Sequence, residues 1–474
     1  MSERRGQFSS RLGFILAAAG SAVGIGNLVA FPVVATKNGG GAFLVIYIAF
    51  VALICFPVMV AEIAMGRAAK KNPVGAFYAL SGESKFWGRL GGLAILTPFM
   101  IAVFYSVITI WIMMYMVQSA IGNLDQLAEP AAFGEIVASP NLFIYLVLTM
   151  ALVFLILAGG VKGGIEKAAK ILMPTLMLML IALVLFVLTL DNAVAGLRYY
   201  LIPDFSKIDS TVLRSALNHA FFSLSLGMGI LITYGSYFNR EEKIVSATRL
   251  VAVMDTSVAF IAGLLILPAI FAMNPDVDVQ TLSESSVSLI FSYLPQLFLE
   301  METLLGYFGA SFVATFFFVL VFFAAMTSLV SISEIPIAWM VDEKNYSRRK
   351  AIAIMAIVAG VFIALASMSL GMVDGLSSMV TYGGKNKSFF DVIYDLFYDT
   401  VLPFIGFLVC IFCSYRWKRS DFINEIGKGD ESFSSSLLAS YVTLSLGTFI
   451  PLILLLVFAN NVAQIYFGFN LFGF

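Results

Sequence analysis

Residues that could bind an ion or a small molecule interrupt an apolar stretch near the start of the chain. Residues 20–27 read GSAVGIGN and have apolar sequence on both sides. Each glycine costs a helix about 1 kcal/mol relative to alanine, and Ser21 and Asn27 add polar groups. Irregular backbone at membrane depth survives only where it lines a cavity or is buried in protein. The stretch therefore predicts a broken helix whose released carbonyl and amide groups can meet a ligand.

A second stretch about two hundred residues later has the same character. Residues 222–229 read FSLSLGMG, and Gly227 and Gly229 repeat the spacing of Gly24 and Gly26. Two interrupted apolar segments in corresponding halves of a chain indicate a transport site near the middle of the membrane. Glu62, an acid in the middle of another apolar segment, is expensive there and so has a functional or network role.

The elements that must position these residues are membrane helices. Of 474 residues 60% are hydrophobic and only 12% are charged, which is typical of a polytopic membrane protein. A net charge of −1 gives no reason to expect nucleic-acid binding, and three cysteines give no disulfide framework. Segments long enough to cross about 30 Å of hydrocarbon fall at eleven places: 12–36, 42–66, 89–120, 141–158, 168–190, 213–238, 250–273, 308–340, 350–370, 389–415 and 434–459.

The positive charges orient these spans. With the N-terminus inside, all but six of the 28 Lys and Arg lie in inner segments, the six being Lys37, Arg198, Lys207, Arg214, Lys385 and Lys387. The first span follows Arg4 and Arg5 as a secretory signal would, but its apolar pattern continues through Pro32, so we expect a retained helix. We expect a multi-pass membrane protein with its N-terminus in the cytoplasm and its C-terminus outside.

The spans divide into two sets of five, with a break in the first helix of each set. An odd number of spans inverts the second copy, and two inverted copies form a site that opens to either side in turn. We expect a first repeat over 1–190, an inverted second repeat over 191–415, and an inner loop, eleventh helix and outer C-terminus over 416–474. The fold class is an all-α membrane protein with broken helices one and six.

Several motifs in this order carry a family signature. They are RLGFILA at 11–17, the GSAVGIGN stretch, Phe31-Pro32, NGGGAF at 38–43, EIAMG at 62–66, FFSLSLGMG at 221–229 and AAMTS at 324–328. The set resembles the neurotransmitter:sodium symporter family, in particular its bacterial amino-acid transporters. The resemblance implies a sodium-coupled symporter of a bacterial cytoplasmic (inner) membrane that binds two Na⁺ ions.

The resemblance also implies the ligand sets. Sodium site one would use Ala22, Asn27, Ser223 and Asp255, and sodium site two would use Gly20, Val23, Ala324, Thr327 and Ser328. The substrate would contact Ala22, Gly24, Gly26, Ile101, Tyr105, Phe222, Ser223, Ser225, Met228 and Ile332. An unwound helix suits sodium because it exposes carbonyl oxygens that can replace the ion's water shell. From the residues alone, Thr327 and Ser328 could equally be hydroxyls bonded within their own helix.

Further residues would brace or gate this site. Glu62 would bond the amide groups freed at the breaks, with Glu334 as a second polar brace. Phe222 would close over the substrate from outside, and Arg5 and Asp342 match an inner gate. The chain departs from the family at the outer gate, where Ala30 replaces an arginine. The acidic partner aligns near Tyr394, beside Asp395, so outer closure would depend on Phe222, Tyr105 and Tyr394.

Asp255 affects which ions we expect to be needed for transport. We align it with the region near Tyr47, Ser223 and His219 that holds chloride in chloride-dependent relatives. A fixed carboxylate can supply the same negative charge, so we expect transport without chloride. A buried carboxylate whose cation has left favours a proton, which allows proton counter-transport. His219 would either share that proton or be a packing residue.

The sequence thus predicts a symporter for apolar or aromatic L-amino acids, since no charged group lines the expected substrate pocket. The alternatives are an ion channel, a membrane-embedded enzyme, or a transporter of the same family for a different small amine or amino acid. A channel would need a repeated filter, and an enzyme a catalytic cluster; the chain's only histidine is His219 and no nucleotide-loop context surrounds residues 20–26. The oligomeric state is left open.

Overall fold

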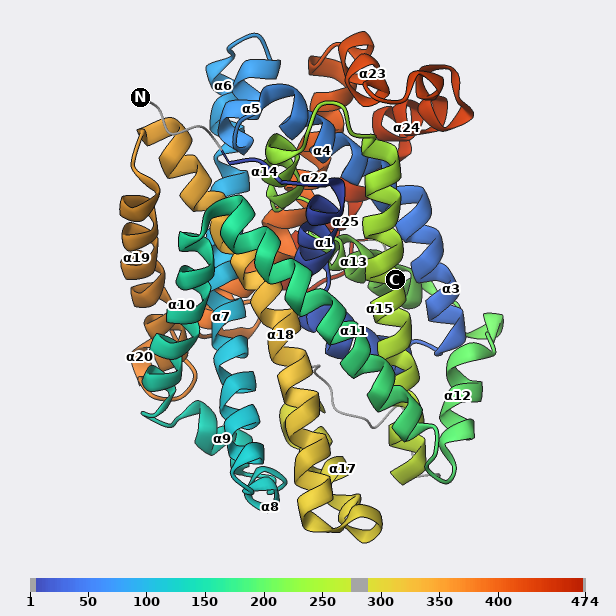
Figure 1. The fold of residues 1–474 in the computed structure, drawn as a ribbon, viewed down its shortest axis with the longest axis vertical. Coiled ribbons are helices and arrows are strands. Elements are labelled where there is room, and N and C mark those ends of the chain that lie inside the picture. Colours follow the sequence, from blue (N-terminus) through green and yellow to red (C-terminus); the bar gives the residue numbers. More distant parts are fainter. Residues whose placement is uncertain (1–5, 274–288, 472–474) are drawn as a thin grey trace.

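The computed structural model describes residues 6–273 and 289–471, and the described chain is a bundle of helices with one short hairpin (Figure 1). Its first half comprises α1 (Arg11–Ala22), a π-helical turn (Gly26–Ala30), α2 (Phe31–Lys37), α3 (Gly41–Phe50), a π-helical turn (Val51–Cys55), α4 (Phe56–Ala69), α5 (Pro73–Leu80), α6 (Lys85–Gly91), α7 (Leu93–Ala120), α8 (Leu124–Leu127), α9 (Ala132–Val137), α10 (Leu142–Ala158), a π-helical turn (Val161–Glu166) and α11 (Lys167–Val187).

The second half begins with α12 (Ala193–Leu201), a 3-10 turn (Phe205–Lys207), α13 (Ser210–Ser223), α14 (Ile230–Tyr237) and α15 (Ile244–Met273). It continues with a π-helical turn (Leu289–Tyr293), α17 (Leu294–Glu300), α18 (Glu302–Lys344), α19 (Arg348–Met368), α20 (Asp374–Ser377) and the antiparallel hairpin of β1 (Val380–Tyr382) and β2 (Lys385–Lys387). It ends with α21 (Phe389–Ile393), a π-helical segment (Tyr394–Val401), α22 (Leu402–Ile411), a π-helical turn (Phe412–Arg416), α23 (Arg419–Gly427), a 3-10 turn (Glu431–Ser435), α24 (Leu437–Gly447) and α25 (Phe449–Phe467).

The apolar helices are long enough to make this a polytopic membrane protein. Within the described residues, eight helices have the length and composition of a membrane span, and a ninth span is formed if the bent pair 11–22 and 26–37 counts as one. The apolar helix α10 is shorter, at 17 residues. Helices α13 and α14 are separated by the second glycine-rich stretch. The membrane fold and both helix breaks are confirmed, while the count of eleven spans stays a prediction.

The first break is short and sharp. Helix α1 ends at Ala22, Val23 is extended, and the helical path resumes at Gly26 after a bend of 53°. Ser10 caps the start of α1 by accepting a hydrogen bond from the Gly13 amide. The predicted interruption over residues 20–27 is therefore narrower in the structure, because Gly20 and Ser21 are still helical.

The second break is longer and depends on left-handed backbone. Between Ser223 and Ile230 the φ angles of Ser225, Gly227 and Gly229 are +56°, +74° and +69°. Glycine adopts such angles without steric cost, whereas a serine there is uncommon. The surrounding structure must therefore hold Ser225 in this unfavourable left-handed backbone conformation.

The two breaks lie at the centre of the bundle. In Figure 1 α1 is surrounded by α11, α15 and α18, and α7 runs alongside α18 for much of its length. The face with α5, α6 and α23 is the one predicted to be cytoplasmic, and α8, α9 and α17 lie at the opposite end.

Candidate functional site

The two breaks are joined to each other by serine hydroxyls. The Ser225 hydroxyl, from the second break, donates to the Ser21 carbonyl at the first break (3.1 Å). Ser328 of α18 donates to the carbonyls of Ser21 and Val23, at 3.1 and 3.2 Å. Three separate segments thus meet around carbonyl oxygens that the end of α1 leaves without a helical partner.

A small cavity of about 20 Å³ lies at this junction. Nine of the ten residues predicted to contact the substrate line it, namely Ala22, Gly24, Gly26, Tyr105, Phe222, Ser223, Ser225, Met228 and Ile332. Ser21 and Ser328 line it as well. Ile101 is not among the lining residues, although it is fully buried on α7. A volume of this size holds about one water molecule, so side chains must move apart to admit an amino acid.

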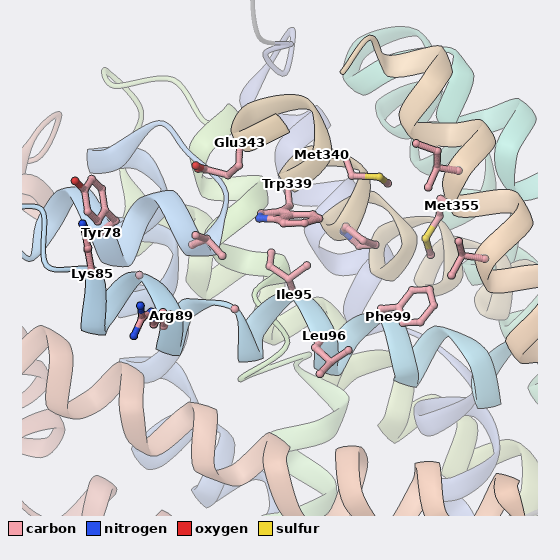
Figure 2. A pocket seen from close by; sticks show the side chains of 16 residues that line it. Tyr78, Lys85, Arg89, Ile95, Leu96, Phe99, Trp339, Met340, Glu343 and Met355 are labelled. Atoms are coloured by element: carbon pink, nitrogen blue, oxygen red, sulfur yellow. The ribbon is translucent and has the colours of Figure 1, made fainter. Parts of the chain in front are cut away.

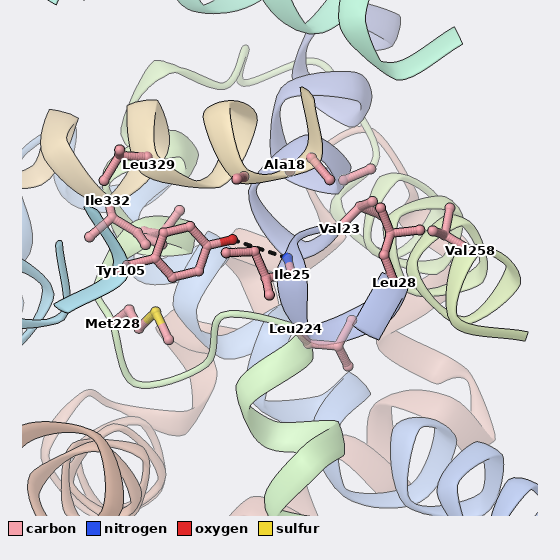
Figure 3. Close-up of a cluster of buried hydrophobic side chains, with 14 of the residues drawn as sticks. Ala18, Val23, Ile25, Leu28, Tyr105, Leu224, Met228, Val258, Leu329 and Ile332 are labelled. Carbon is pink, nitrogen blue, oxygen red and sulfur yellow. Dashed lines mark hydrogen bonds between the residues drawn. The ribbon is translucent and has the colours of Figure 1, made fainter. Parts of the chain in front are cut away.

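Tyr105 of α7 contacts the first break directly. Its hydroxyl oxygen accepts a hydrogen bond from the Ile25 amide at 3.2 Å, drawn in Figure 3. A methyl group on Gly24 would lie 2.6 Å from that oxygen and 2.7 Å from the Ser328 hydroxyl. Position 24 must therefore be glycine for the break to approach both α7 and α18.

A carboxylate cluster lies beside the first break. The Asp255 side chain, fully buried on α15, accepts hydrogen bonds from the Asn27 amide (2.7 Å), the Ser223 hydroxyl (3.0 Å to each oxygen) and the Tyr47 hydroxyl (3.1 Å). The oxygen of the Asn27 side chain accepts from the Gly24 amide at 3.1 Å. The structure thus brings three residues of the predicted sodium site one, Asn27, Ser223 and Asp255, into one hydrogen-bonded group.

The neighbouring histidine packs against this cluster. The His219 ring centre lies 5.8 Å from that of Tyr47 and 5.5 Å from that of Phe31. Its Nε2 atom is buried and has no hydrogen-bond partner among the described residues. Tyr47 therefore lies between His219 and Asp255, since it packs on the first and donates a hydrogen bond to the second.

The residues predicted for sodium site two form a second group of oxygens, but its two hydroxyls point differently. Thr327 donates to the carbonyl of Ala324 (2.9 Å) and more weakly to that of Phe323 (3.3 Å), both in its own helix. Ser328 turns instead to the carbonyls of α1. A methyl group on Gly20 would be 3.4 Å from the Thr327 Cβ, so α1 and α18 are in close contact here.

The two acids predicted as braces have different partners. Glu62 is fully buried on α4, and its Oε1 accepts a hydrogen bond from the Gly227 amide of the second break at 2.8 Å. Glu334 lies away from both breaks, where it accepts from Tyr237 (2.9 Å) and pairs with both terminal nitrogens of Arg348 (3.0 and 2.6 Å). Glu334 therefore joins α14, α18 and the start of α19.

Aromatic rings cover the side of the cavity that is predicted to face outward. The Phe222 and Tyr398 ring centres are 4.5 Å apart, Tyr398 lies 4.6 Å from Tyr394, and Phe104 packs against both tyrosines. Asp395 is held by Tyr382 at 2.7 Å and forms an ion pair with Lys387 of β2, also at 2.7 Å. Asp395 thus pairs with a cation from the hairpin, Lys387. The sequence did not predict this pair, because Ala30 replaces the arginine that the family has at the outer gate.

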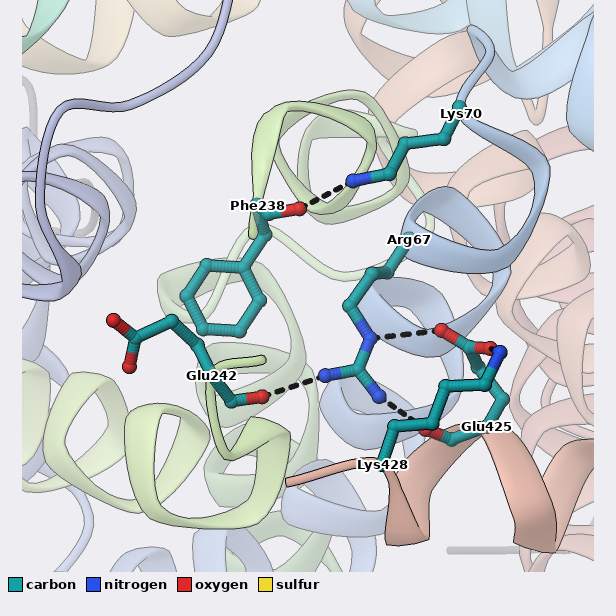
Figure 4. A network of polar contacts seen from close by, with 6 residues as sticks. All are labelled: Arg67, Lys70, Phe238, Glu242, Glu425 and Lys428. Carbon is teal, nitrogen blue, oxygen red and sulfur yellow. Dashed lines mark hydrogen bonds and ion pairs between the residues drawn. The ribbon is translucent and has the colours of Figure 1, made fainter. Parts of the chain in front are cut away.

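At the opposite end, Asp342 of α18 accepts hydrogen bonds from the backbone and side-chain amides of Asn72, each at 3.1 Å. Its predicted partner Arg5 lies outside the described residues. Nearby, the buried Arg67 of α4 pairs with Glu425 of α23 at 2.8 Å and donates to the Glu242 carbonyl at 2.6 Å (Figure 4). This network fastens α23 and the segment just before α15 to α4.

Sequence reasoning missed some participants. The Ser21 carbonyl accepts hydrogen bonds from two hydroxyl groups, whereas the sequence indicated a role only for the polar side chain of Ser21. The aromatic cover also includes Tyr398, whose four-residue spacing from Tyr394 on one helical face was the available signal. Arg348, the partner of Glu334, could have been suspected because a buried carboxylate in a membrane helix requires one.

Comparisons with known proteins agree with this geometry. Residues 5–128 and 133–472 match the model of the Sodium:neurotransmitter symporter family. The sodium-dependent transporter YhdH of Bacillus subtilis is 32% identical over 98% of this chain and 100% of its own length. A sodium-dependent transporter of Haemophilus influenzae is also 32% identical, over 97% of this chain and 98% of its own.

A solved structure is similar throughout. The crystal structure of MhsT in complex with L-phenylalanine superposes with a TM-score of 0.82 and 37% sequence identity, covering 96% of this chain and 99% of that one.

Proposed function

Because this chain belongs to the Sodium:neurotransmitter symporter family, we propose that it carries an apolar or aromatic L-amino acid together with sodium by alternating access. The observation that carries the proposal is the cavity between the two helix breaks, which is lined by released backbone and serine hydroxyls. The amino acid's charged main chain would occupy the unwound segments, where helix ends supply amide groups for a carboxylate.

The lining favours an apolar side chain. None of its eleven residues is charged, and Phe222, Met228 and Ile332 supply an apolar wall. A charged substrate side chain would lose its hydration there without a partner, a cost of several kcal/mol. Met228 is unbranched and can adapt to rings of different size. The similar protein MhsT was solved with L-phenylalanine, which belongs to the same chemical class.

Two sodium ions would bind next to the substrate. The first would use the Ala22 carbonyl with Asn27, Ser223 and Asp255, and would touch the substrate carboxylate. The second would lie between α1 and α18, using oxygens of Gly20, Val23, Ala324, Thr327 and Ser328. Hydroxyls that now donate to carbonyls, such as Ser328 to Val23, would turn their oxygens toward the ion. Sodium would then replace hydrogen bonds that hold the first break to α18.

Asp255 would make chloride unnecessary, because its carboxylate is the negative charge beside sodium site one. Three neutral donors surround it, so the ion's positive charge is what balances it. When sodium leaves, a proton can take its place on the buried carboxylate, which would give proton counter-transport. Closure from outside would rest on Phe222 and the tyrosines that cover it.

The protein would be a multi-pass carrier of a bacterial inner membrane with its N-terminus in the cytoplasm and its C-terminus outside, as its positive charges indicate. The inverted repeats over 1–190 and 191–415 would supply the two parts that move against each other. Residues 416–474 would add the eleventh helix.

A binding screen tests the substrate class. The purified protein is heated with each of the twenty amino acids in sodium buffer and in potassium buffer. A ligand that binds only the folded protein raises its unfolding temperature, so leucine, phenylalanine, tyrosine or tryptophan should do so in sodium alone. Strong stabilisation by glutamate or lysine, with none by these four, would show that the pocket is wrongly assigned.

A further inference from the structure

A much larger cavity lies away from the transport site, at the end of the molecule predicted to be cytoplasmic. Its volume is about 770 Å³, within the range of roughly 300–1,000 Å³ common for ligand pockets. It is bounded by α5, α6, the first turns of α7, the last turns of α18 and by α19. Nothing in the proposed transport cycle uses this space.

One end of this cavity is apolar and open at its side. Ile95, Leu96 and Phe99 of α7 face Met355 and Val358 of α19 across it, as Figure 2 shows for the labelled residues. Leu96 and Val358 are 47% and 40% exposed, and Ile357, next to Val358 in the chain, is more exposed still. In a membrane protein such surfaces face lipid, so the apolar end opens toward the acyl chains of the bilayer.

The other end carries cations. Lys85 and Arg89, one turn apart on α6, line the cavity together with Tyr78 (Figure 2). Both cations are exposed, and neither forms an ion pair within residues 6–273 and 289–471. The acid that lines the cavity, Glu343, accepts a hydrogen bond from the Asn72 side chain at 3.0 Å. The two cations therefore lie at the polar end of a cavity whose other end is apolar.

A cavity with cations at one end and an apolar, open side at the other suits a molecule with an anionic headgroup and an acyl chain. The geometry points to a binding site for an anionic phospholipid of the inner leaflet, its phosphate at Lys85 and Arg89 and an acyl chain between α7 and α19. Basic pockets between membrane helices on the cytoplasmic side suit anionic headgroups. A free phosphate would use only the cations, and a zwitterionic phospholipid would bring an ammonium group that Lys85 and Arg89 repel, so the combination selects an anionic lipid.

The occupant would contact α7 and α18, which also line the central cavity. Trp339 and Pro336 line the cavity on α18, and Ile332 lines the central cavity one turn earlier. Proline has no amide hydrogen to donate to the carbonyl four residues before it, so α18 is weakened between the two cavities. A lipid that fills the larger cavity is expected to stabilise the fold at this point.

Native mass spectrometry of the full-length protein tests the site. Protein purified in detergent is incubated with phosphatidylglycerol, with phosphatidylethanolamine or with inorganic phosphate, and retained lipid and unfolding temperature are measured. The variants are Lys85→Gln with Arg89→Gln, which removes the cations, and Ile354→Trp, which fills the apolar end. The matched control is Lys162→Gln with Arg249→Gln, two exposed cations that do not line the cavity and lie in segments predicted to be cytoplasmic.

Wild type and control should retain phosphatidylglycerol and be stabilised by it. The cation variant should retain it about thirty times less, because it lacks two cations and each is worth about 1 kcal/mol near an anionic surface. Ile354→Trp should also lose it with both cations present. Equal retention by all variants, equal retention of phosphatidylethanolamine, or equal stabilisation by phosphate alone would overturn the inference.

Discussion

The break after Ala22 and the break after Ser223 handle their unpaired backbone groups in different ways. At the first break, the carbonyls of Ser21 and Val23 accept hydrogen bonds from the hydroxyl groups of Ser225 and of Ser328 on α18. At the second, the Gly227 amide donates to the buried carboxylate of Glu62. Hydroxyl groups can rotate to present oxygen instead of hydrogen, whereas the Glu62 carboxylate holds an amide that the second break has released.

This difference assigns separate roles to the two breaks. In the proposed cycle the first break would exchange hydrogen bonds for a cation without leaving any carbonyl unpaired, and so would bind and release sodium. The second is fixed by an acid that would be costly to leave without its partner in the membrane. Damage to the first break should change ion dependence, and damage to the second should change stability.

The largest effect is expected from Thr327→Ala with Ser328→Ala, which removes two hydroxyl oxygens beside the first break. Losing two contacts to a charged ligand, each worth about 1.5–3 kcal/mol, should raise the half-saturating sodium concentration by about 100-fold or more. Sodium titration of uptake in proteoliposomes measures this. Ser367→Ala is the control, because Ser367 is a buried serine bonded within α19. Unchanged sodium dependence in the double variant would mean that the hydroxyls bond only to their helices.

Asp255→Ser should reduce uptake in chloride-free buffer by about tenfold or more, because sodium then lacks its fixed counter-charge. Added chloride should restore part of the activity, whereas wild type should be indifferent to chloride replaced by gluconate. Asp374→Ser, at an exposed acid outside the site, controls for loss of charge. If wild type stops when chloride is removed, Asp255 does not replace the anion.

Glu62 tests the second break. Glu62→Ala leaves the Gly227 amide unpaired in a buried place and should lower the free energy of unfolding by about 1–3 kcal/mol. Glu62→Gln keeps an oxygen acceptor and should lie closer to wild type. Thermal unfolding measures both, with sodium affinity recorded in parallel. A stable alanine variant with altered sodium affinity would reverse the roles assigned to the two breaks.

The smallest effect is expected outside both breaks, at Lys387→Met. The Lys387–Asp395 pair is partly exposed, at 20% and 11% for the two side chains, and such pairs contribute about 0–1 kcal/mol. Uptake and sodium affinity should stay within about twofold of wild type. A loss comparable to that of the Asp255 variant would make this pair an outer gate in place of the missing arginine.

The breaks themselves could be predicted because clustered glycine and serine disfavour a continuous helix at membrane depth. The grouping of Asn27, Ser223 and Asp255, by contrast, came from the family resemblance, since these residues lie in three distant segments. Periodicity alone gives the face of a helix that a side chain occupies, and not which helix it meets.

Other features could not be read from the sequence for physical reasons. Adjacent residues on a helix differ by about 100° in direction, so Thr327 and Ser328 separate toward different carbonyls, although the sequence predicts them as a pair. The role of the Ser21 carbonyl depends on where α1 stops, and helix ends shift by a residue or two between similar sequences. Lys387 reaches Asp395 only because a hairpin of two three-residue strands returns it there.

Uptake of labelled L-phenylalanine into proteoliposomes tests sodium-coupled symport most directly. An inward sodium gradient should drive accumulation of intact amino acid above the external concentration, and collapsing the gradient with a sodium ionophore should release it. Accumulation that is equal in potassium buffer, or mere equilibration across the membrane with sodium present, would contradict the account.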